Sequence, residues 1–141
     1  MNSVEVADLL ESDINGRQWS RPFRAERVYV PTYDTSRENE LKCTILVVDE
    51  EEKRFARRLV EIRSFVEVGI IERFIDPFEK PKKDALVALC TEIKKFYKKK
   101  ILGEYTCVKT TYRPIYSDED MRTKQLFVGV IMVEFLSHYK D

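Results

Sequence analysis

The chain has 141 residues, the size of one ordinary domain, and 43% of them are hydrophobic, close to the globular average. Its 4 glycines and 5 prolines are too few for a collagenous or a Pro/Gly-rich disordered chain. Basic and acidic residues number 25 each, so the net charge is zero. This balance argues against a dedicated duplex-DNA binder, whose affinity comes from excess lysine and arginine. It is typical of a chain that hides part of its surface in an assembly.

The cysteine and histidine residues do not form the pattern of a metal site. Cys43, Cys90 and Cys107 are far apart in the chain, and the one histidine, His138, lies close to the C-terminus. A structural zinc site needs four closely organised ligands, so we expect no metal and three small buried thiols in a reducing compartment. The sequence has no apolar run long enough to span a membrane and no secretory signal pattern, which predicts a soluble, cytoplasmic protein.

The first half of the chain predicts one helix followed by three strands. Apolar residues from Val4 to Ile14 recur at helical spacing, with Ser3 as the expected N-cap and Gly16 as the expected stop. Later segments alternate apolar and polar residues, as strands do, and are separated by polar stretches. The predicted order is a helix over 3–14, strands over 23–30 and 41–48, polar segments over 32–40 and 49–58, and a strand over 60–74.

The second half predicts a long helix and two further strands. After a turn that contains prolines, apolar residues from Leu86 to Leu102 recur at steps of three and four. Asp84 is placed to begin this helix, lysines crowd its C-terminal end where they suit the helix dipole, and Gly103 is placed to end it. The remaining chain predicts a strand over 105–112, a polar segment over 113–125 and a long apolar strand over 126–136.

These elements predict a single α+β domain that covers residues 1–141. Strands joined by polar loops favour antiparallel pairing, and amphipathic helices need a sheet face on which to bury their apolar stripes. We therefore expect a two-layer sandwich, with a mainly antiparallel sheet of four to five strands and two helices packed on one face. The expected contact between the sheet and the long helix consists of Val66, Val68, Ile93, Phe96, Val128 and Val130.

No pattern of residues predicts catalysis. The sequence contains no GxGxxG, GxxxxGK[ST] or GxSxG motif, and His138 lies at an end that is expected to fray. Grouped carboxylates occur at 49–52 and 118–120, but both groups lie in polar segments where solvation prevents acid–base tuning. We therefore expect neither an enzyme nor a bound cofactor. The lysine run over 94–100 is open to two interpretations, a phosphate-contacting stripe or a solvated helix end.

Two long polar segments and the last strand indicate protein contacts. Segments 32–40 and 113–125 join strands, are rich in charge and each contain a tyrosine, a composition typical of polar interfaces. The last strand is apolar on both faces, so one layer of helices leaves its other face uncovered, and a second subunit is the expected cover. The candidate subunit-interface residues are Tyr33, Asp34, Arg37, Glu50, Glu51, Lys98, Lys99, Tyr116, Asp118 and Arg122.

The order of these landmarks resembles a known family of phage proteins. A strand that ends in proline, FRAERVYVP, precedes a strand with a charged segment, LKCTILVVDEEEKRFARR, and then the alternating strand EIRSFVEVGIIERF. The helix DALVALCTEIKKFYKKK, the sequence RPIY, an acidic loop and the apolar strand LFVGVIMVEF follow. Over residues 3–137, this order resembles the tail terminator proteins (also tail completion or neck proteins) of long-tailed bacteriophages.

The resemblance implies a virion structural protein of the tail or neck, assembled in the host cytoplasm. It implies an α+β subunit that forms a homo-hexameric ring, caps the tail tube, stops its polymerisation and joins it to the head connector or head-closure protein. DNA would pass through the ring without sequence-specific binding, and no cofactor, membrane or catalysis is implied. Two alternatives stay open: a small nucleic-acid-binding α+β domain that uses residues 94–100, and another ring-forming component such as a tail-tube or head-closure protein.

Overall fold

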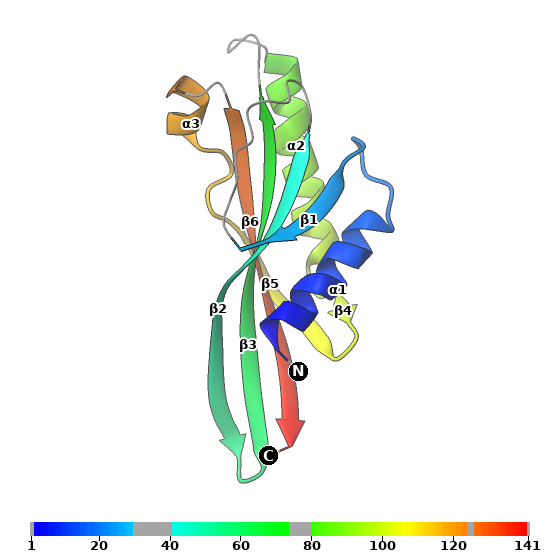
Figure 1. The fold of residues 1–141 in the computed structure, drawn as a ribbon, viewed down its shortest axis with the longest axis vertical. Helices are drawn as coiled ribbons and strands as arrows, with labels where there is room; N and C mark the ends of the chain where they lie inside the picture. Colours follow the sequence, from blue (N-terminus) through cyan, green and yellow to red (C-terminus); the bar gives the residue numbers. More distant parts are fainter. Residues whose placement is uncertain (1, 30–40, 74–79, 124–125, 141) are drawn as a thin grey trace.

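Three helices and six strands make up the part of the chain that the structure describes. The structure is a computed structural model, and it describes residues 2–29, 41–73, 80–123 and 126–140. The elements in chain order (Figure 1) are α1 (Ser3–Asn15), β1 (Arg24–Val28), β2 (Lys42–Ala56), β3 (Leu59–Arg73), α2 (Lys80–Tyr97), β4 (Ile101–Leu102), β5 (Tyr105–Tyr112), α3 (Asp118–Thr123) and β6 (Leu126–Lys140).

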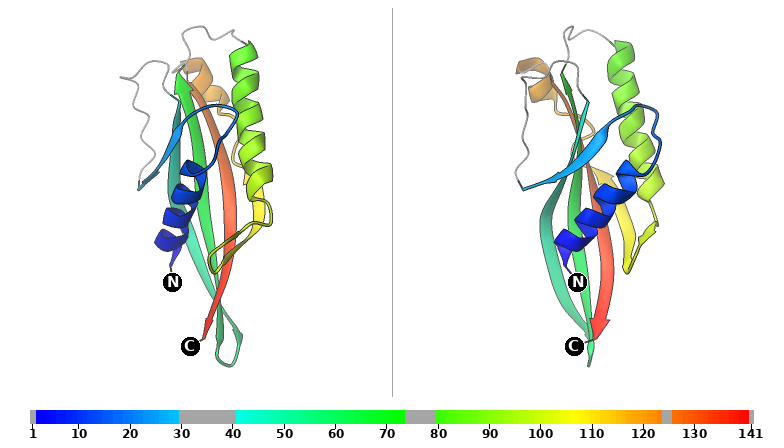
Figure 2. Two further views of the ribbon diagram at one scale, coloured as in Figure 1. Left: turned by 90° about the vertical axis from the view of Figure 1, so that its right-hand side faces the viewer. Right: turned by 45° about the vertical axis from the view of Figure 1, so that its right-hand side comes forward.

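The six strands form one curled, mixed sheet in the order β1-β2-β3-β6-β5-β4 (Figures 1 and 2). β1 and β2 run parallel, and the other neighbouring strands run antiparallel. The fold is α+β, as predicted, but the prediction of four to five strands and two helices was too low. β4 and α3 are too short to give a periodic signal, and the parallel pairing of β1 depends on contacts that local sequence patterns do not report.

Helix α1 forms because its first turn is capped and one of its faces is apolar. Asn2 Oδ1 accepts a hydrogen bond from the backbone N–H of Glu5 at 2.9 Å, so Asn2 is the N-cap rather than the predicted Ser3. Gly16 ends the helix, as predicted. The buried apolar residues of the helix are Val6, Ala7, Leu10 and Ile14.

The charged segment 49–58 is mostly strand, and its prediction as a polar segment between strands was wrong. β2 runs through most of it and pairs antiparallel with β3 up to the connecting turn. Opposite charges face each other across this pair, with Glu51 opposite Arg63 and Lys53 opposite Glu61. Because the partners that stabilise this strand come from β3, its own composition does not reveal it.

The main core lies between the two longer helices and one face of the sheet. Val66 and Val68 of β3 and Ile93 of α2 are fully buried there, which confirms their predicted role. Phe96 is partly buried at the margin of this core, so it is less central than predicted. Among the described residues, the largest fully buried side chains are Tyr97, Tyr105, Phe127, Phe135, Leu10, Ile14, Ile45, Ile70, Leu86, Leu89 and Ile93.

The opposite face of the sheet carries a second, smaller apolar cluster. The prediction that Val128 and Val130 contact the long helix was wrong, because Phe127 and Ile131 of β6 enter the main core instead. Both alternating sets of β6 residues are apolar, so periodicity alone cannot tell which set meets the helices. The second cluster consists of Ile71, Leu126 and Val128, with Val130 packed against it.

Segment 113–125, predicted as a long polar segment, contains α3 and continues the edge of the sheet. The Arg113 N–H donates to the Val130 carbonyl at 2.7 Å, and the Ser117 N–H donates to the Val128 carbonyl at 2.9 Å. The Arg113–Pro114 peptide bond is cis. These bonds place the start of α3 beside β6 and leave less of this segment as free loop than predicted.

The ends of α2 also differ from the prediction. The helix begins at Lys80 rather than Asp84, because Pro81 fits a first helical turn, where the backbone N–H has no helical partner. It ends at Tyr97, before the predicted stop at Gly103. Gly103 instead lies in the turn between β4 and β5, with a φ of 61° that favours glycine.

The lower halves of three long strands run past the N-terminal end of α1, which Ser3 ties to Glu50 and Ser64, and the ends of these strands project beyond the helices (Figures 1 and 2). We call this part the arm, and it comprises residues 47–64 of the β2–β3 hairpin and residues 134–140 of β6. β1 pairs with β2 from Lys42 to Leu46, so within the arm no described strand lies on the outer side of β2. Among the residues that the structure describes, β2 is therefore an open sheet edge along the arm.

Candidate assembly surfaces

The sequence-predicted interface residues fall on three separate surfaces, apart from Tyr33, Asp34 and Arg37, which lie outside the described residues. The surfaces are on the arm, at the C-terminal end of α2 and around α3, which lie in different parts of the fold (Figure 1). The structure thus does not gather the predicted residues into one site. The arm holds Glu50 and Glu51, the end of α2 is followed by Lys98 and Lys99, and α3 and the residues before it hold Tyr116, Asp118 and Arg122.

The surface around α3 is acidic and includes an aromatic residue. The Tyr116 side chain is 43% exposed, and its ring centre lies 6.3 Å from that of buried Phe127. Met121 packs against the main core and so fixes the short helix to the domain. Arg122 binds Asp118 one turn earlier, with 2.7 Å between guanidinium and carboxylate, and the three acids of the first turn suit the helix dipole.

The surface at the end of α2 is basic. The ammonium groups of Lys94 and Lys100 lie over aromatic rings, at 5.3 and 4.4 Å from the ring centres, which holds these two side chains against the protein. Lys98 and Lys99 follow the last turn of the helix and are exposed. Lys99 has a φ of 64°, in the left-handed region, which does not continue the helix beyond Tyr97.

The β2 strand of the arm has acidic residues on both of its faces. Glu50 Oε1 accepts hydrogen bonds from the Ser3 N–H at 3.1 Å and the Ser3 hydroxyl at 2.6 Å, which ties the arm to the start of α1. Glu52 accepts a hydrogen bond from a tyrosine hydroxyl of β6. Glu51 and Lys53 alternate with these residues along the strand, so they lie on the other face, and both are exposed.

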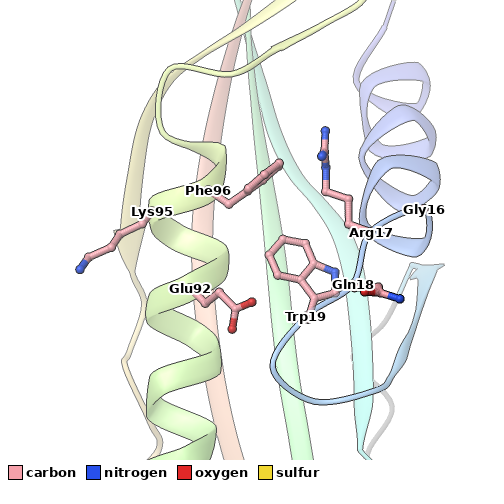
Figure 3. A pocket seen from close by; sticks show the side chains of 7 residues that line it. All are labelled: Gly16, Arg17, Gln18, Trp19, Glu92, Lys95 and Phe96. Carbon is pink, nitrogen blue, oxygen red and sulfur yellow. The ribbon is translucent and has the colours of Figure 1, made fainter.

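A groove that the sequence analysis did not identify lies between α2 and the connector after α1 (Figure 3). Its volume is about 650 Å³, and the rings of Trp19 and Phe96 meet edge-on within it at 5.4 Å. The Arg17 guanidinium stacks over Phe96 at 4.1 Å, and Glu92 accepts a hydrogen bond from the backbone after Trp19. Lys95 points to the far side of α2 (Figure 3). The one tryptophan of the chain, in a polar connector, was the available signal.

A small polar network beside this groove joins α1 to α2. Asp13 Oδ2 accepts hydrogen bonds from the Tyr97 hydroxyl at 2.6 Å and from Arg17 Nε at 3.0 Å. Burial alone would raise the pKa of Asp13, but the hydrogen bonds from Arg17 and Tyr97 outweigh it, so this pKa is lowered. Burial and the bond to Asp13 raise the pKa of Tyr97.

The lowered pKa of Asp13 predicts an acid-dependent contribution to stability. A carboxyl whose pKa is lower in the folded state stabilises the protein above its unfolded pKa, about 3.9, and loses this contribution as the pH falls through the folded pKa. The variant Asp13→Asn should therefore melt at a lower temperature than the wild type at pH 7. At pH 2.5 the two melting temperatures should lie closer together, as followed by circular dichroism. An equal gap at both pH values would contradict this prediction.

The three cysteines are buried, as predicted, and burial raises the pKa of each thiol, to about 12 for Cys90. Among the described residues, no three histidine, cysteine or acidic side chains gather where they could hold a metal ion. Within the described ranges, no helix is long and apolar enough to cross a membrane.

Comparison with known proteins leaves the function open. No protein-family model matches the chain, and no curated protein matches it. Several solved structures match, and one of them does so over 99% of this chain and 94% of its own, with a TM-score of 0.42 and 9% sequence identity. A likeness this weak carries no argument about family or function.

Proposed function

We propose that this chain is a virion structural protein that assembles into a ring of identical subunits. The ring caps the tail tube of a long-tailed phage, ends its polymerisation and joins the tail to the head connector. Two things support the proposal: the order of sequence landmarks that resembles the tail terminators, and a surface built for contact with other subunits. The partners are further copies of this chain, the tail tube protein and the head connector or head-closure protein.

The projecting arm is the observation that carries this proposal. Its strands continue past the helices, so neither α1 nor α2 backs the outer part of the hairpin (Figures 1 and 2). β6 pairs with β3 along the arm as a third strand, so the outer part of the arm lacks only a helix packed on its face. An extended, charged ribbon of this kind suits a subunit that reaches onto a neighbour.

Ring closure requires two different, complementary surfaces on each subunit. The basic end of α2, with Lys98 and Lys99, and the acidic surface of α3, with Asp118, carry opposite charge. They lie in different parts of the fold, as a head-to-tail contact requires (Figure 1). Exposed ion pairs contribute about 0–1 kcal/mol each, so their effect accumulates through repetition around the ring.

The test combines the mass of the assembly with its action on tail tubes. The wild-type chain should give rings by native mass spectrometry and electron microscopy, and should shorten the tubes formed by purified tail tube protein. The double variant Lys98→Glu and Lys99→Glu should stay monomeric and leave the tubes long, because like charges then face each other at every contact. Its melting temperature should match that of the wild-type monomer, since both lysines are exposed.

A matched control makes the same change of charge elsewhere. Lys80 and Lys109 are also exposed and lie outside the arm and the two charged surfaces, so Lys80→Glu with Lys109→Glu should preserve both the ring and the shortening of tubes. A wild-type chain that remains monomeric and binds duplex DNA in a salt-sensitive way would overturn the proposal in favour of a nucleic-acid-binding domain. Rings that leave tube length unchanged would instead indicate a different ring-forming component.

A further inference from the structure

We propose that the open β2 edge of the arm pairs antiparallel with the same edge of a second copy of this chain. The pairing would join two subunits around a two-fold axis through the middle of the edge. It goes beyond the contact between the α2 end and the α3 surface that would close the ring, because it assigns to the arm a named partner edge and a two-fold symmetry. Neither contact needs the other to form.

The backbone of β2 provides the first reason. β1 covers this strand as far as Leu46, and no described strand pairs with its outer side along the rest of its length, up to Ala56. An edge strand presents a row of backbone donors and acceptors that another strand can satisfy. Val48, at the bulge where the open edge begins, is 47% exposed. The arm thus offers a long, accessible edge to a partner strand.

The order of charges along this edge selects the partner. Residues 49–52 are all acidic, and the strand then turns basic with Lys53 and Arg54, followed by Arg57 and Arg58 in the turn. A copy that paired in parallel register would place acid against acid and base against base. A copy that pairs antiparallel places the acidic half of each edge against the basic half of the other. The edge is therefore complementary to itself in one direction only.

The alternation of the strand limits the register of this pair to axes that pass through a residue, and the charges select one of them. A two-fold axis perpendicular to the sheet keeps the two copies' faces on the same sides, so a residue must oppose one of its own face. Centring the axis on Glu52 places Glu51 opposite Lys53 of the second copy and Glu50 opposite its Arg54, each twice. Glu52 then faces its own copy, and this one like-charged pair is relieved by the hydrogen bond that each Glu52 accepts from the Tyr139 hydroxyl of its own chain.

A cysteine at the axis tests the pairing directly in the full chain. With Glu52→Cys, the two new thiols should lie close enough for a disulfide, because opposed residues of an antiparallel pair have Cβ atoms about 4.5–5.5 Å apart. Mild oxidation should therefore give covalent dimers on a non-reducing denaturing gel. Glu51→Cys is the matched control and should give few dimers, because residue 51 faces residue 53. The wild type should also give none, since its own three cysteines are buried.

Exchanging the charges at positions 51 and 53 then distinguishes a contact between two copies from effects within one chain. In the Glu52→Cys background, Glu51→Lys alone or Lys53→Glu alone should reduce cross-linking about tenfold or more, because each makes both symmetric pairs repulsive. A mixture of these two variants should cross-link again, as heterodimers. The chain with both changes should also cross-link, although within that chain the exchange sets like charges beside Arg63 and Glu61, the β3 neighbours of positions 51 and 53.

Two results would overturn the inference. One is equal cross-linking through positions 51 and 52, which would indicate random collision of exposed thiols. The other is a mixture of the two charge variants that cross-links no better than either variant alone. The ring proposal survives both results, because its test changes the two lysines after α2 and leaves the arm unchanged. Conversely, a chain that forms no rings can still give the position-52 cross-link.

Discussion

Replacing Glu72 by glutamine should lower the free energy of unfolding by about 3 kcal/mol, although this residue belongs to no proposed contact surface. The Glu72 side chain is fully buried at the end of β3. Its carboxylate lies 2.7 Å from an Arg21 guanidinium nitrogen and 3.1 Å from the Lys82 ammonium. Arg21 follows α1 and Lys82 opens α2, so one carboxylate holds together three parts of the fold.

The expected loss of stability in Glu72→Gln comes from the two positive charges that remain without their carboxylate. Removing one partner of a fully buried ion pair typically costs about 3–5 kcal/mol, because the remaining charge has lost its compensation. Arg21 and Lys82 are 29% and 22% exposed, so water partly compensates them and the expected loss is at the lower end of that range. Glutamine keeps the shape of the side chain, which separates the charge from the packing.

Urea denaturation of each variant measures the effect. Glu104→Gln is the matched control, because it removes an exposed carboxylate in a turn and should change the free energy of unfolding by about 0.5 kcal/mol or less. The double variant Arg21→Gln and Glu72→Gln should lose less than the sum of the two single variants, because the pair acts as a unit. Losses of equal size for Glu72→Gln and Glu104→Gln would show that the buried cluster contributes no net stability.

The spacing of apolar residues along the chain correctly predicted the long helix α2, the strand β3 and the contact between them. The apolar stripe that contains Ile93 and the alternation that contains Val66 and Val68 gave the helix, the strand and their contact. Glu72 illustrates the limit of this reasoning. An acidic residue at the end of a strand is indistinguishable from a solvated one until Arg21 and Lys82 are placed beside it by the tertiary fold.

The candidate surfaces show the same limit. The sequence indicated Lys98, Tyr116 and Glu51 as interface residues, and the structure places them on three different surfaces. The groove was missed because it depends on the approach of Trp19 to Phe96, two residues far apart in the chain. The open edge of the arm was missed for a related reason. Whether a strand lies at the edge of a sheet depends on the order of the strands, and local sequence patterns do not report that order.

The second large prediction compares two adjacent residues of β6 whose side chains lie on opposite faces of the sheet. Phe135→Ala should lower the free energy of unfolding by about 3–5 kcal/mol, because the ring is fully buried in the main core and alanine leaves a cavity. A domain of this size has a total stability of about 5–15 kcal/mol, so this loss is a large part of it. The melting temperature, followed by circular dichroism, should fall by about 10–20 °C.

Leu136→Ala is the matched control, since this residue follows Phe135 on β6 and points to the opposite face of the sheet. Leu136 is partly exposed there and lies opposite Arg63 of β3, so its truncation removes less buried surface and leaves no closed cavity. The expected loss is about 1 kcal/mol or less. If Leu136→Ala destabilised the isolated subunit as much as Phe135→Ala, the face of the arm opposite the helices would be a second core within one chain. The arm would then be stable without a neighbour, which would remove the main structural support for an assembly role.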